Sequence, residues 1–273
     1  MKNILLHEYR IPIKGVKKKV IYHFSDTHLT EYDALSTEEE ILQAQKKTED
    51  WLKIRKHFTD RYEEPFGESQ CRSASEHFLN LLNESRNGDA LVITGDLFDY
   101  VSPANIRFFE NACRDFAPPM MAVCGNHENS NEIPSGTAVS KMKEPIQKVE
   151  WDDLLLLGLD DSKREITQAQ YDALKAALEG DKKIIVAMHI PIMVEGNEAL
   201  LKDAGEYFQL NHPNCPDLNH KFIDLIKANT NKIIAVLCGH LHFKNNTPLF
   251  GECVQYVSTQ GIAGNINKYI IGE

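Results

Sequence analysis

Apolar runs separated by turn residues recur along the chain and define its expected strands. They predict strands at 4–13, 16–24, 90–94, 120–124, 154–159, 183–188, 233–238, 253–258 and 266–271. The first two runs, separated by Lys14 and Gly15, predict a strand pair joined by a turn. Hydrophobic residues at helical spacing predict helices between the middle strands. Because strands and helices alternate there, the pattern predicts an α/β fold.

Capping patterns mark where several helices begin. Three starts carry such a pattern: Ser73 with Glu76, Thr167 with Gln170, and Ser102 followed by Pro103. Residues 129–150 and 197–215 are polar and weakly periodic, so each is expected to be mostly loop with one short helix.

Residues 31–70 interrupt the alternation and are interpreted as a helical insertion. Ser36 and Glu39 match a capping box, so the helix is predicted to begin there. The segment holds eleven Asp or Glu against six Lys or Arg, a net charge of −5. Two interpretations stand side by side: a peripheral helix packed on the core, or a flap that restricts the substrate. With no internal repeat or linker-like tract, residues 1–273 are expected to form one domain.

Five of the apolar runs end in polar residues of related chemistry. These ends are Asp26-Thr27-His28, Gly95-Asp96, Gly125-Asn126-His127-Glu128, His189 and Gly239-His240-Leu241-His242. Active groups in α/β folds collect at the carboxyl ends of strands, so these residues are expected to converge. In extended chain, residues two apart point the same way, so Asp26 and His28 are expected to face one ion, as are His240 and His242. The glycines permit sharp turns and close approach.

The donor types predict a centre with two metal ions. Carboxylate, amide and imidazole groups without thiolates suit Mn, Fe, Zn, Co or Ni and do not choose among them. The seven candidate ligands are too many for one ion with an open position: Asp26, His28, Asp96, Asn126, His189, His240 and His242. Two divalent ions, two aspartates and a bridging hydroxide leave a charge of about +1, which favours an anionic phosphate ester.

His127 neighbours a candidate ligand and is expected to point elsewhere. We assign it to protonating the leaving oxygen, a task that suits an imidazole near neutral pH. Glu128 could orient His127, and Asp99 could support a metal-binding histidine. For both carboxylates a plain role in a turn is equally open.

Composition narrows the partners and the compartment. The 273 residues carry a net charge of −10, which argues against nucleic acid or an anionic membrane as the main partner. No apolar run approaches the length of a membrane span. The six cysteines are scattered without a CxxC pair, which predicts reduced thiols in a cytoplasmic protein. The oligomeric state is not predicted.

Taken in order, the motifs from Asp26 to His242 resemble the motif set of the calcineurin-like metallophosphoesterases. The resemblance implies a four-layer αββα sandwich, with two mixed β-sheets face to face and helices outside. It also implies the roles of the residues. Asp26, His28 and His242 would hold one metal, and Asn126, His189 and His240 the other, with Asp96 bridging and His127 assisting the leaving group.

Differences within this family narrow the expected activity. Purple acid phosphatases carry a tyrosine where this chain has Asp99, and lipid A pathway pyrophosphatases carry an arginine where it has His127. The segment from Gly95 to Asp99 resembles a motif of double-strand-break repair nucleases. The whole pattern is most similar to cyclic-nucleotide phosphodiesterases and nucleotide-type pyrophosphatases.

We therefore predict a dinuclear metal-dependent phosphoesterase that hydrolyses a small phosphodiester or phosphomonoester. A metal-bridging hydroxide would attack phosphorus while His127 assists the leaving group. Two alternatives remain: a metal-dependent nuclease, and a non-catalytic metal-stabilised scaffold that binds a protein through residues 31–70.

Overall fold

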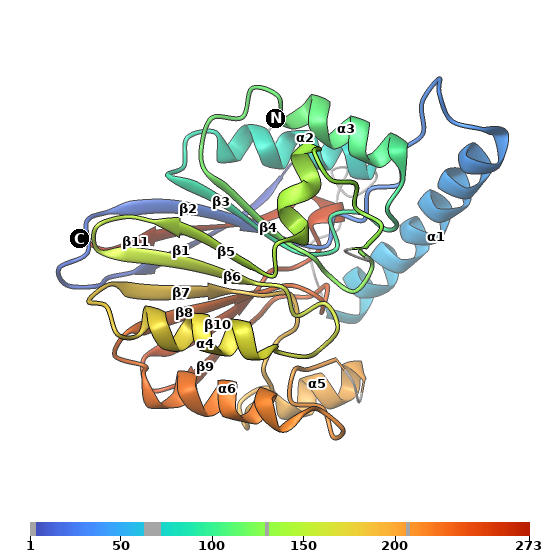
Figure 1. Ribbon diagram of the computed structural model, residues 1–273. Helices are drawn as coiled ribbons and strands as arrows, with labels where there is room; N and C mark the ends of the chain where they lie inside the picture. Colours follow the sequence, from blue (N-terminus) through green and yellow to red (C-terminus); the bar gives the residue numbers. More distant parts are fainter. Residues whose placement is uncertain (1–3, 63–71, 129–130, 206–207) are drawn as a thin grey trace.

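Two β-sheets packed face to face form the centre of the molecule (Figure 1). The computed structural model describes residues 4–62, 72–128, 131–205 and 208–273. The first sheet has the order β1-β11-β2-β3-β4, with bounds Leu5–Ile11, Asn265–Ile271, Lys19–Phe24, Ala90–Thr94 and Met120–Val123. The second has the order β5-β6-β7-β8-β10-β9, with bounds Ile146–Glu150, Leu154–Leu159, Lys183–Ala187, Ile233–Cys238, Cys253–Val257 and Asn245–Phe250. Both sheets mix parallel and antiparallel pairs.

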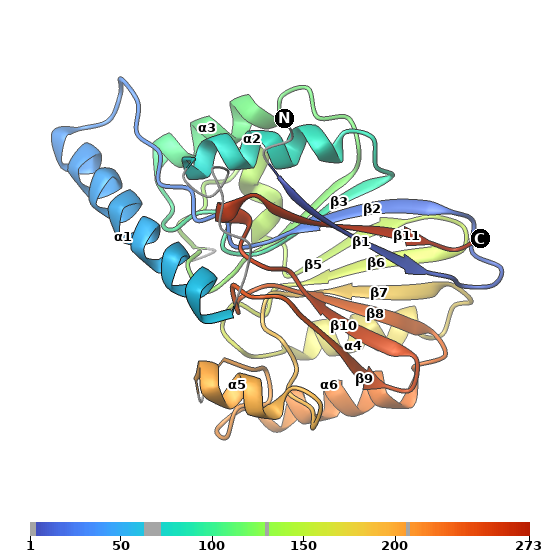
Figure 2. The same cartoon turned by 180° about the vertical axis from the view of Figure 1, so that it is seen from behind.

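Helices cover the outer faces of both sheets (Figures 1 and 2). α2 (Ala74–Ser85), α3 (Pro103–Cys113) and the 3₁₀ helix η2 (Ala138–Lys143) lie on the side of the first sheet. α4 (Gln168–Ala177), α5 (Glu198–Ala204) and α6 (Asp217–Ala228) lie on the side of the second. This is the predicted four-layer sandwich, and the fold class is confirmed. Among the described helices, none combines the length and apolar character that a membrane-spanning helix requires.

The strand β6 shows how the sequence builds these layers. Leu154 and Leu156 belong to the core cluster between the sheets, whereas Leu155, Leu157 and Leu159 belong to the cluster under the outer helices. Side chains alternate along a strand, so a strand covered on both faces needs apolar residues at every position. The uninterrupted run at 154–159 is the result.

Local capping explains where the helices begin. Ser73 and Thr167 cap α2 and α4 in complete capping boxes, and Ser102 caps α3, as predicted. The helix α1 (Glu38–Tyr62) is different. Thr37 forms the box with Glu40, through the backbone N–H of Thr37 at 2.6 Å and the N–H of Glu40 at 3.3 Å. The predicted start at Ser36 is therefore wrong by one residue.

Three strand expectations are corrected by the topology. The runs at 4–13 and 16–24 do not pair, because β11 lies between β1 and β2 and hydrogen-bonds to both. The strands β5 and β9 were not predicted. Both are edge strands with polar residues on their exposed side, and β9 contains Pro248, so neither produces a clear apolar run. η2 and α5 are the short helices expected within 129–150 and 197–215.

Candidate metal centre

The polar strand ends meet at one end of the sandwich. β2, β3 and β4 are parallel neighbours in the first sheet, and β7 and β8 are parallel in the second. Parallel neighbours place their carboxyl ends at one edge, so the residues that follow them gather there. A connected set of contacts includes all eight predicted site residues: Asp26, His28, Asp96, Asn126, His127, His189, His240 and His242.

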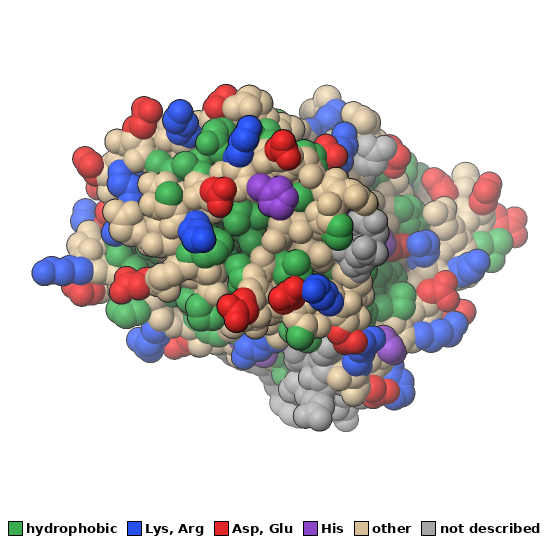
Figure 3. All heavy atoms as spheres, turned by 90° about the horizontal axis from the view of Figure 1, so that it is seen from below, with side chains coloured by type: hydrophobic (Ala, Val, Ile, Leu, Met, Phe, Trp, Pro, Cys, Tyr) green, Lys and Arg blue, Asp and Glu red, His purple; other side chains and the backbone are tan. Residues whose placement is uncertain are grey.

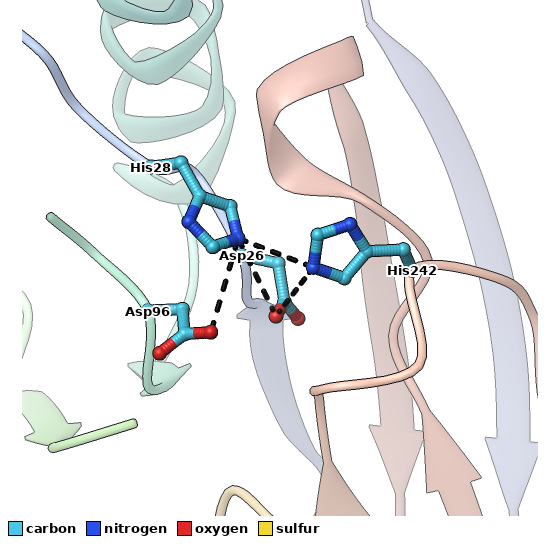
Figure 4. Close-up of side chains that lie close together, drawn as sticks. All are labelled: Asp26, His28, Asp96 and His242. Carbon is cyan, nitrogen blue, oxygen red and sulfur yellow. Dashed lines mark hydrogen bonds and ion pairs between the residues drawn. The ribbon is translucent and has the colours of Figure 1, made fainter. Parts of the chain in front are cut away.

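Four buried side chains form the first donor group, and Figure 4 shows them directed toward one another. His28 Nε2 lies 3.9 Å from Asp26 Oδ1 and 3.8 Å from Asp96 Oδ2. His242 Nε2 lies 3.3 Å from Asp26 Oδ1 and 3.1 Å from His28 Nε2. Two imidazole nitrogens and two carboxylate oxygens at this spacing suit a transition-metal ion.

Asp96 also belongs to a second donor group, with His189 and His240. The Oδ2 atom of Asp96 that faces His28 lies 3.4 Å from His189 Nε2. Asn126 is exposed, and its Oδ1 lies 3.1 Å from the same histidine nitrogen. Within the described chain, Asp96 is thus the carboxylate common to both groups.

Hydrogen bonds around the imidazoles leave nitrogen atoms for a ligand. His189 Nδ1 lies 2.6 Å from the carbonyl oxygen of Thr94, which can only accept, so Nδ1 carries the hydrogen. The other nitrogen, Nε2, then faces the oxygens of Asp96 and Asn126. His240 Nε2 is buried and has no hydrogen-bond partner among the described residues. These donor atoms fit the cations that the motifs predict.

The charges of the site favour a cation. Burial lowers the pKa of His240 to about 3 and that of His28 to about 4, so both rings are neutral at neutral pH. A neutral imidazole is the form that binds metal. Burial acts on His189 in the same direction, but the carboxylates of Asp96 and Asp26 outweigh it and raise its pKa to about 10. A proton and a metal ion therefore compete for Nε2 of His189.

The backbone at the predicted ligands is left-handed rather than extended. Among the described non-glycine residues, six have positive φ, and five of these are predicted ligands: Asp26 (56°), His28 (43°), Asp96 (48°), His240 (72°) and His242 (60°). The expected extended backbone is therefore wrong, although Asp26 and His28 do belong to one donor group, as predicted. His240 and His242 belong to different donor groups. Unfavourable backbone conformations of this kind concentrate at functional sites.

Two glycines allow the motifs to approach one another. Gly95 has a φ of 85°, and a Cβ atom there would lie 2.5 Å from His189 Nδ1. A Cβ atom at Gly125 would overlap Asp96 Oδ1. The close approach predicted for the glycines that precede ligands is present at both positions.

Glu128 holds the backbone of two motifs instead of orienting His127. Its carboxylate is buried and accepts hydrogen bonds from the N–H groups of Asp96 (3.0 Å), Phe98 (2.7 Å) and Gly125 (2.7 Å). Burial and the neighbouring Asp96 raise the pKa of Glu128 to about 8. The carboxylate thus joins the loop after β3 to the loop after β4.

Asp161 plays the same part in the second sheet and was not identified from the sequence. Its buried carboxylate accepts from the N–H groups of His189 (2.7 Å) and Ile190 (3.0 Å). The available signal was its position, because it follows β6 at the same end of the sandwich as the ligand motifs.

Asp99 contacts His127, the predicted proton donor. His127 Nδ1 lies 3.0 Å from Asp99 Oδ1 and 3.1 Å from the Asp99 carbonyl oxygen. The backbone N–H of His127 donates to Asp96 Oδ1 at 2.9 Å. Asp99 Oδ1 also lies 3.7 Å from His28 Nδ1. The His127 side chain keeps 32% of its surface exposed, so it is accessible from solvent. Asp99 thus lies near the predicted ligand His28, and it lies closer still to His127.

The fold and the donor groups fit a metal-dependent phosphoesterase, and the comparison with known families agrees. Residues 19–244 match the calcineurin-like phosphoesterase family. The chain therefore belongs to this family and is a metal-dependent phosphoric ester hydrolase, which confirms the resemblance seen in the motifs. Members of the family bind two transition-metal ions. No curated protein matches the chain by sequence.

Solved structures resemble the fold at low sequence identity. A dimetal phosphatase from Danio rerio aligns with a TM-score of 0.57 and 9% identity, covering 90% of this chain and 88% of that chain. The purple acid phosphatase PPD1 from yellow lupin (Lupinus luteus) seeds aligns with a TM-score of 0.51 and 12% identity, covering 93% of this chain and 45% of that chain. At such identities the likeness concerns the fold alone.

Proposed function

We propose that this protein hydrolyses a small phosphodiester or phosphomonoester at the two donor groups that share Asp96. The observation that carries the proposal is the position of Asp96 Oδ2, 3.8 Å from His28 Nε2 in one group and 3.4 Å from His189 Nε2 in the other. We further propose that residues 1–273 act as a single domain.

The seven donors divide into two sets of ligands in this proposal. Asp26, His28 and His242 would hold one ion, Asn126, His189 and His240 the other, and Asp96 both. Two divalent ions, when bound, neutralise the charge of the ester and lower the pKa of the attacking water. The neutral amide of Asn126 leaves more positive charge in the site than a carboxylate would, which favours an anionic substrate.

His127 is proposed to give a proton to the leaving oxygen. Its Nδ1 faces the Asp99 carboxylate at 3.0 Å, which leaves Nε2 as the atom that can hold and transfer the proton. The N–H of His127 is bonded to Asp96 Oδ1, so the backbone that carries the ring is fixed relative to the shared carboxylate. The partial exposure of the ring lets a substrate reach it.

A small substrate fits the charge of this protein better than a nucleic acid does. The net charge is −10, and on the face near α5 and α6 acidic and basic side chains are interspersed (Figure 3). A nucleic-acid groove needs a concentrated basic surface. The charge therefore favours a small ester over a nucleic acid as the substrate.

We retain the cytoplasm as the proposed compartment. The described cysteines are free thiols: Cys113, Cys124, Cys215, Cys238 and Cys253. Free buried thiols such as Cys124 and Cys238 are usual in reducing compartments. The remaining cysteine, Cys71, lies outside the described residues.

A reconstitution screen tests the proposed function. Metal-free protein is loaded separately with Mn²⁺, Fe²⁺, Zn²⁺, Co²⁺ or Ni²⁺ and assayed on p-nitrophenyl phosphate, bis-p-nitrophenyl phosphate, cyclic nucleotides, dinucleotide pyrophosphates and short DNA. We expect about two ions per chain and chelator-sensitive hydrolysis of a small ester. Two tightly bound ions without hydrolysis of any ester would support the non-catalytic scaffold, and cleavage of DNA alone would support the nuclease.

A further inference from the structure

The carboxylate of Asp99 is shared between His127 and two side chains of the helix α1. Trp51 Nε1 donates to Asp99 Oδ1 at 2.9 Å, the same oxygen that faces His127 Nδ1 at 3.0 Å. Lys47 Nζ forms an ion pair with Asp99 Oδ2 at 2.9 Å. The Asp99 side chain is 1% exposed, so these contacts, rather than bulk water, surround it.

Trp51 also packs directly on two predicted ligands. Its ring stacks on that of His28, with centroids 3.7 Å apart and an interplanar angle of 26°. It lies 5.3 Å from the ring of His242 at an angle of 24°. The side chain is buried, so α1 forms one wall of the metal centre.

The helix α1 is attached to the rest of the fold at several points. Arg55 donates to the carbonyl oxygen of Ile262 at 2.9 Å, which joins α1 to η3 (Gly261–Ala263). Near its carboxyl end, Arg61 pairs with Asp203 of α5 at 2.6 Å. Figures 1 and 2 show α1 at the end of the sandwich where the strand ends lie. These contacts pack α1 against the fold beside the metal centre, and whether it also restricts the substrate stays a prediction.

We propose that Trp51 and Lys47 are positioning residues for the Asp99–His127 pair, so that the insertion is part of the catalytic site. The inference rests on the proposed function, in which His127 serves the leaving group. The terminal torsion of an aspartate is broad, so its carboxylate is oriented by the groups that bind it. Trp51 and Lys47 bind the two oxygens of Asp99 separately and fix the face that it presents to His127.

Two conservative variants remove these contacts without removing the helix. Trp51→Phe keeps an aromatic ring against His28 but removes the indole N–H, and with it the hydrogen bond to Asp99 Oδ1. Lys47→Met keeps the aliphatic length of the side chain and removes its charge. Lys53→Met is the matched control, because Lys53 lies on the same helix, is exposed, and pairs with the half-exposed Asp50 at 3.5 Å.

The kinetic test compares esters that differ only in their leaving group. Each variant is assayed on a p-nitrophenyl ester and on the corresponding phenyl ester of the class that the wild type hydrolyses. We expect Trp51→Phe and Lys47→Met to lower kcat about tenfold or more for phenyl and less than about threefold for p-nitrophenyl, because a good leaving group needs little proton donation. The KM values and the metal content should be unchanged, and Lys53→Met should match the wild type.

A double-mutant cycle with Asp99→Asn separates positioning from direct contact with substrate. If Lys47 acts through Asp99, Lys47→Met has no further effect on the leaving-group dependence in the Asp99→Asn background. Additive effects, or a higher KM with both esters, would show that Lys47 binds the substrate phosphate and would overturn the inference. An equal loss of kcat with both esters would also overturn it.

A measurement without turnover keeps this inference separate from the proposed function. In zinc-loaded protein labelled with ¹⁵N-histidine, the proton on His127 Nδ1 is identified by its loss in His127→Ala. We expect this resonance to be retained in Lys53→Met and shifted or broadened in Trp51→Phe and Lys47→Met. An unchanged resonance in both variants refutes the positioning role. If the resonance is altered in the variants but the wild type hydrolyses none of the esters, the proposed function is refuted and the positioning role stands.

Discussion

Replacing Glu128 tests whether a buried carboxylate holds the loops of the metal centre together. Glu128 is 3% exposed and accepts three backbone hydrogen bonds, from Asp96, Phe98 and Gly125, at 2.7 to 3.0 Å. Glu128→Ala leaves all three N–H groups without their acceptor. Glu128→Gln keeps the shape, but its amide group can replace only part of the acceptor capacity.

The expected loss of stability follows from this geometry. A buried donor left without a partner costs roughly 1–3 kcal/mol. Water that enters the space left by the alanine satisfies some of the three donors, so we expect Glu128→Ala to lower the free energy of unfolding by about 3–5 kcal/mol. Glu128→Gln places an amide nitrogen against one donor and should cost about 1–3 kcal/mol. Asp96 loses its backbone anchor in Glu128→Ala, so metal affinity should fall by roughly 10–100-fold in that variant.

The assay measures urea unfolding with chelator present, because bound metal would add its own stabilisation. Metal affinity is measured separately by titration of the folded protein. Glu144→Ala and Glu144→Gln are the controls, since this glutamate is exposed. A surface substitution typically changes stability by no more than about 0.5 kcal/mol. A loss this small in Glu128→Ala would refute the role of Glu128 in joining the two loops.

Three further predictions address the ligands, the proton donor and a buried histidine. Asp96→Asn should weaken the binding of both metal ions, whereas His28→Ala should chiefly weaken the binding of one. Metal analysis and an activity assay check this. Two tightly bound ions and normal activity in Asp96→Asn would contradict the role of Asp96 as a ligand of both ions. His127→Ala should keep its metal but lose about 10²–10⁴-fold in kcat on esters with poor leaving groups, and undiminished turnover would exclude His127. Burial lowers the pKa of His23 in the folded protein to about 3, whereas its pKa in the unfolded chain is about 6.5. Between these two pH values the unfolded state therefore binds a proton that the folded state does not. Stability should therefore fall as pH drops from 6.5 toward 3, by up to ~1.4 kcal/mol per pH unit for this group, and His23→Gln should flatten that slope in urea unfolding; an identical slope would argue against it.

The sequence predicted those parts of the fold that depend on local pattern. β6 and β8 lie between two layers, so burial on both faces leaves uninterrupted apolar runs whose ends match the observed strands. The capping boxes at Ser73 and Thr167 depend on residues three apart, and both were predicted correctly.

Long-range pairing and competing local patterns could not be predicted in the same way. β11 inserts between β1 and β2, and this joins the two ends of the chain, a contact that no local pattern records. At α1, both Ser36 with Glu39 and Thr37 with Glu40 match the capping-box pattern in the sequence, so the spacing alone does not show which pair forms the box. The polar edge strands β5 and β9 lack the continuous apolar signal of the inner strands.

The site residues were identifiable from chemistry, but the contacts that hold them were not. Asp, Asn and His after apolar runs at several places predicted the convergence that the structure shows. A carboxylate such as Glu128, Asp161 or Asp99 has no comparable signature, because turn residues of the same type are common. The contacts of Asp99 with α1 depend on how a long insertion folds back on the site, which residue spacing does not specify.

The left-handed residues explain why these supporting contacts are needed. A left-handed conformation costs a non-glycine residue about 1–2 kcal/mol, and five predicted ligands adopt it. The N–H of each of three strained residues is bonded to another motif: Asp26 to the Gly95 carbonyl at 3.1 Å, His28 to the Asp96 carbonyl at 3.0 Å, and His240 to the Asp26 carboxylate at 3.0 Å. Each motif thus holds its neighbour in an unfavourable conformation. Loss of one such contact should therefore disturb donors of both groups, and metal affinity should respond cooperatively to mutations that change no ligand.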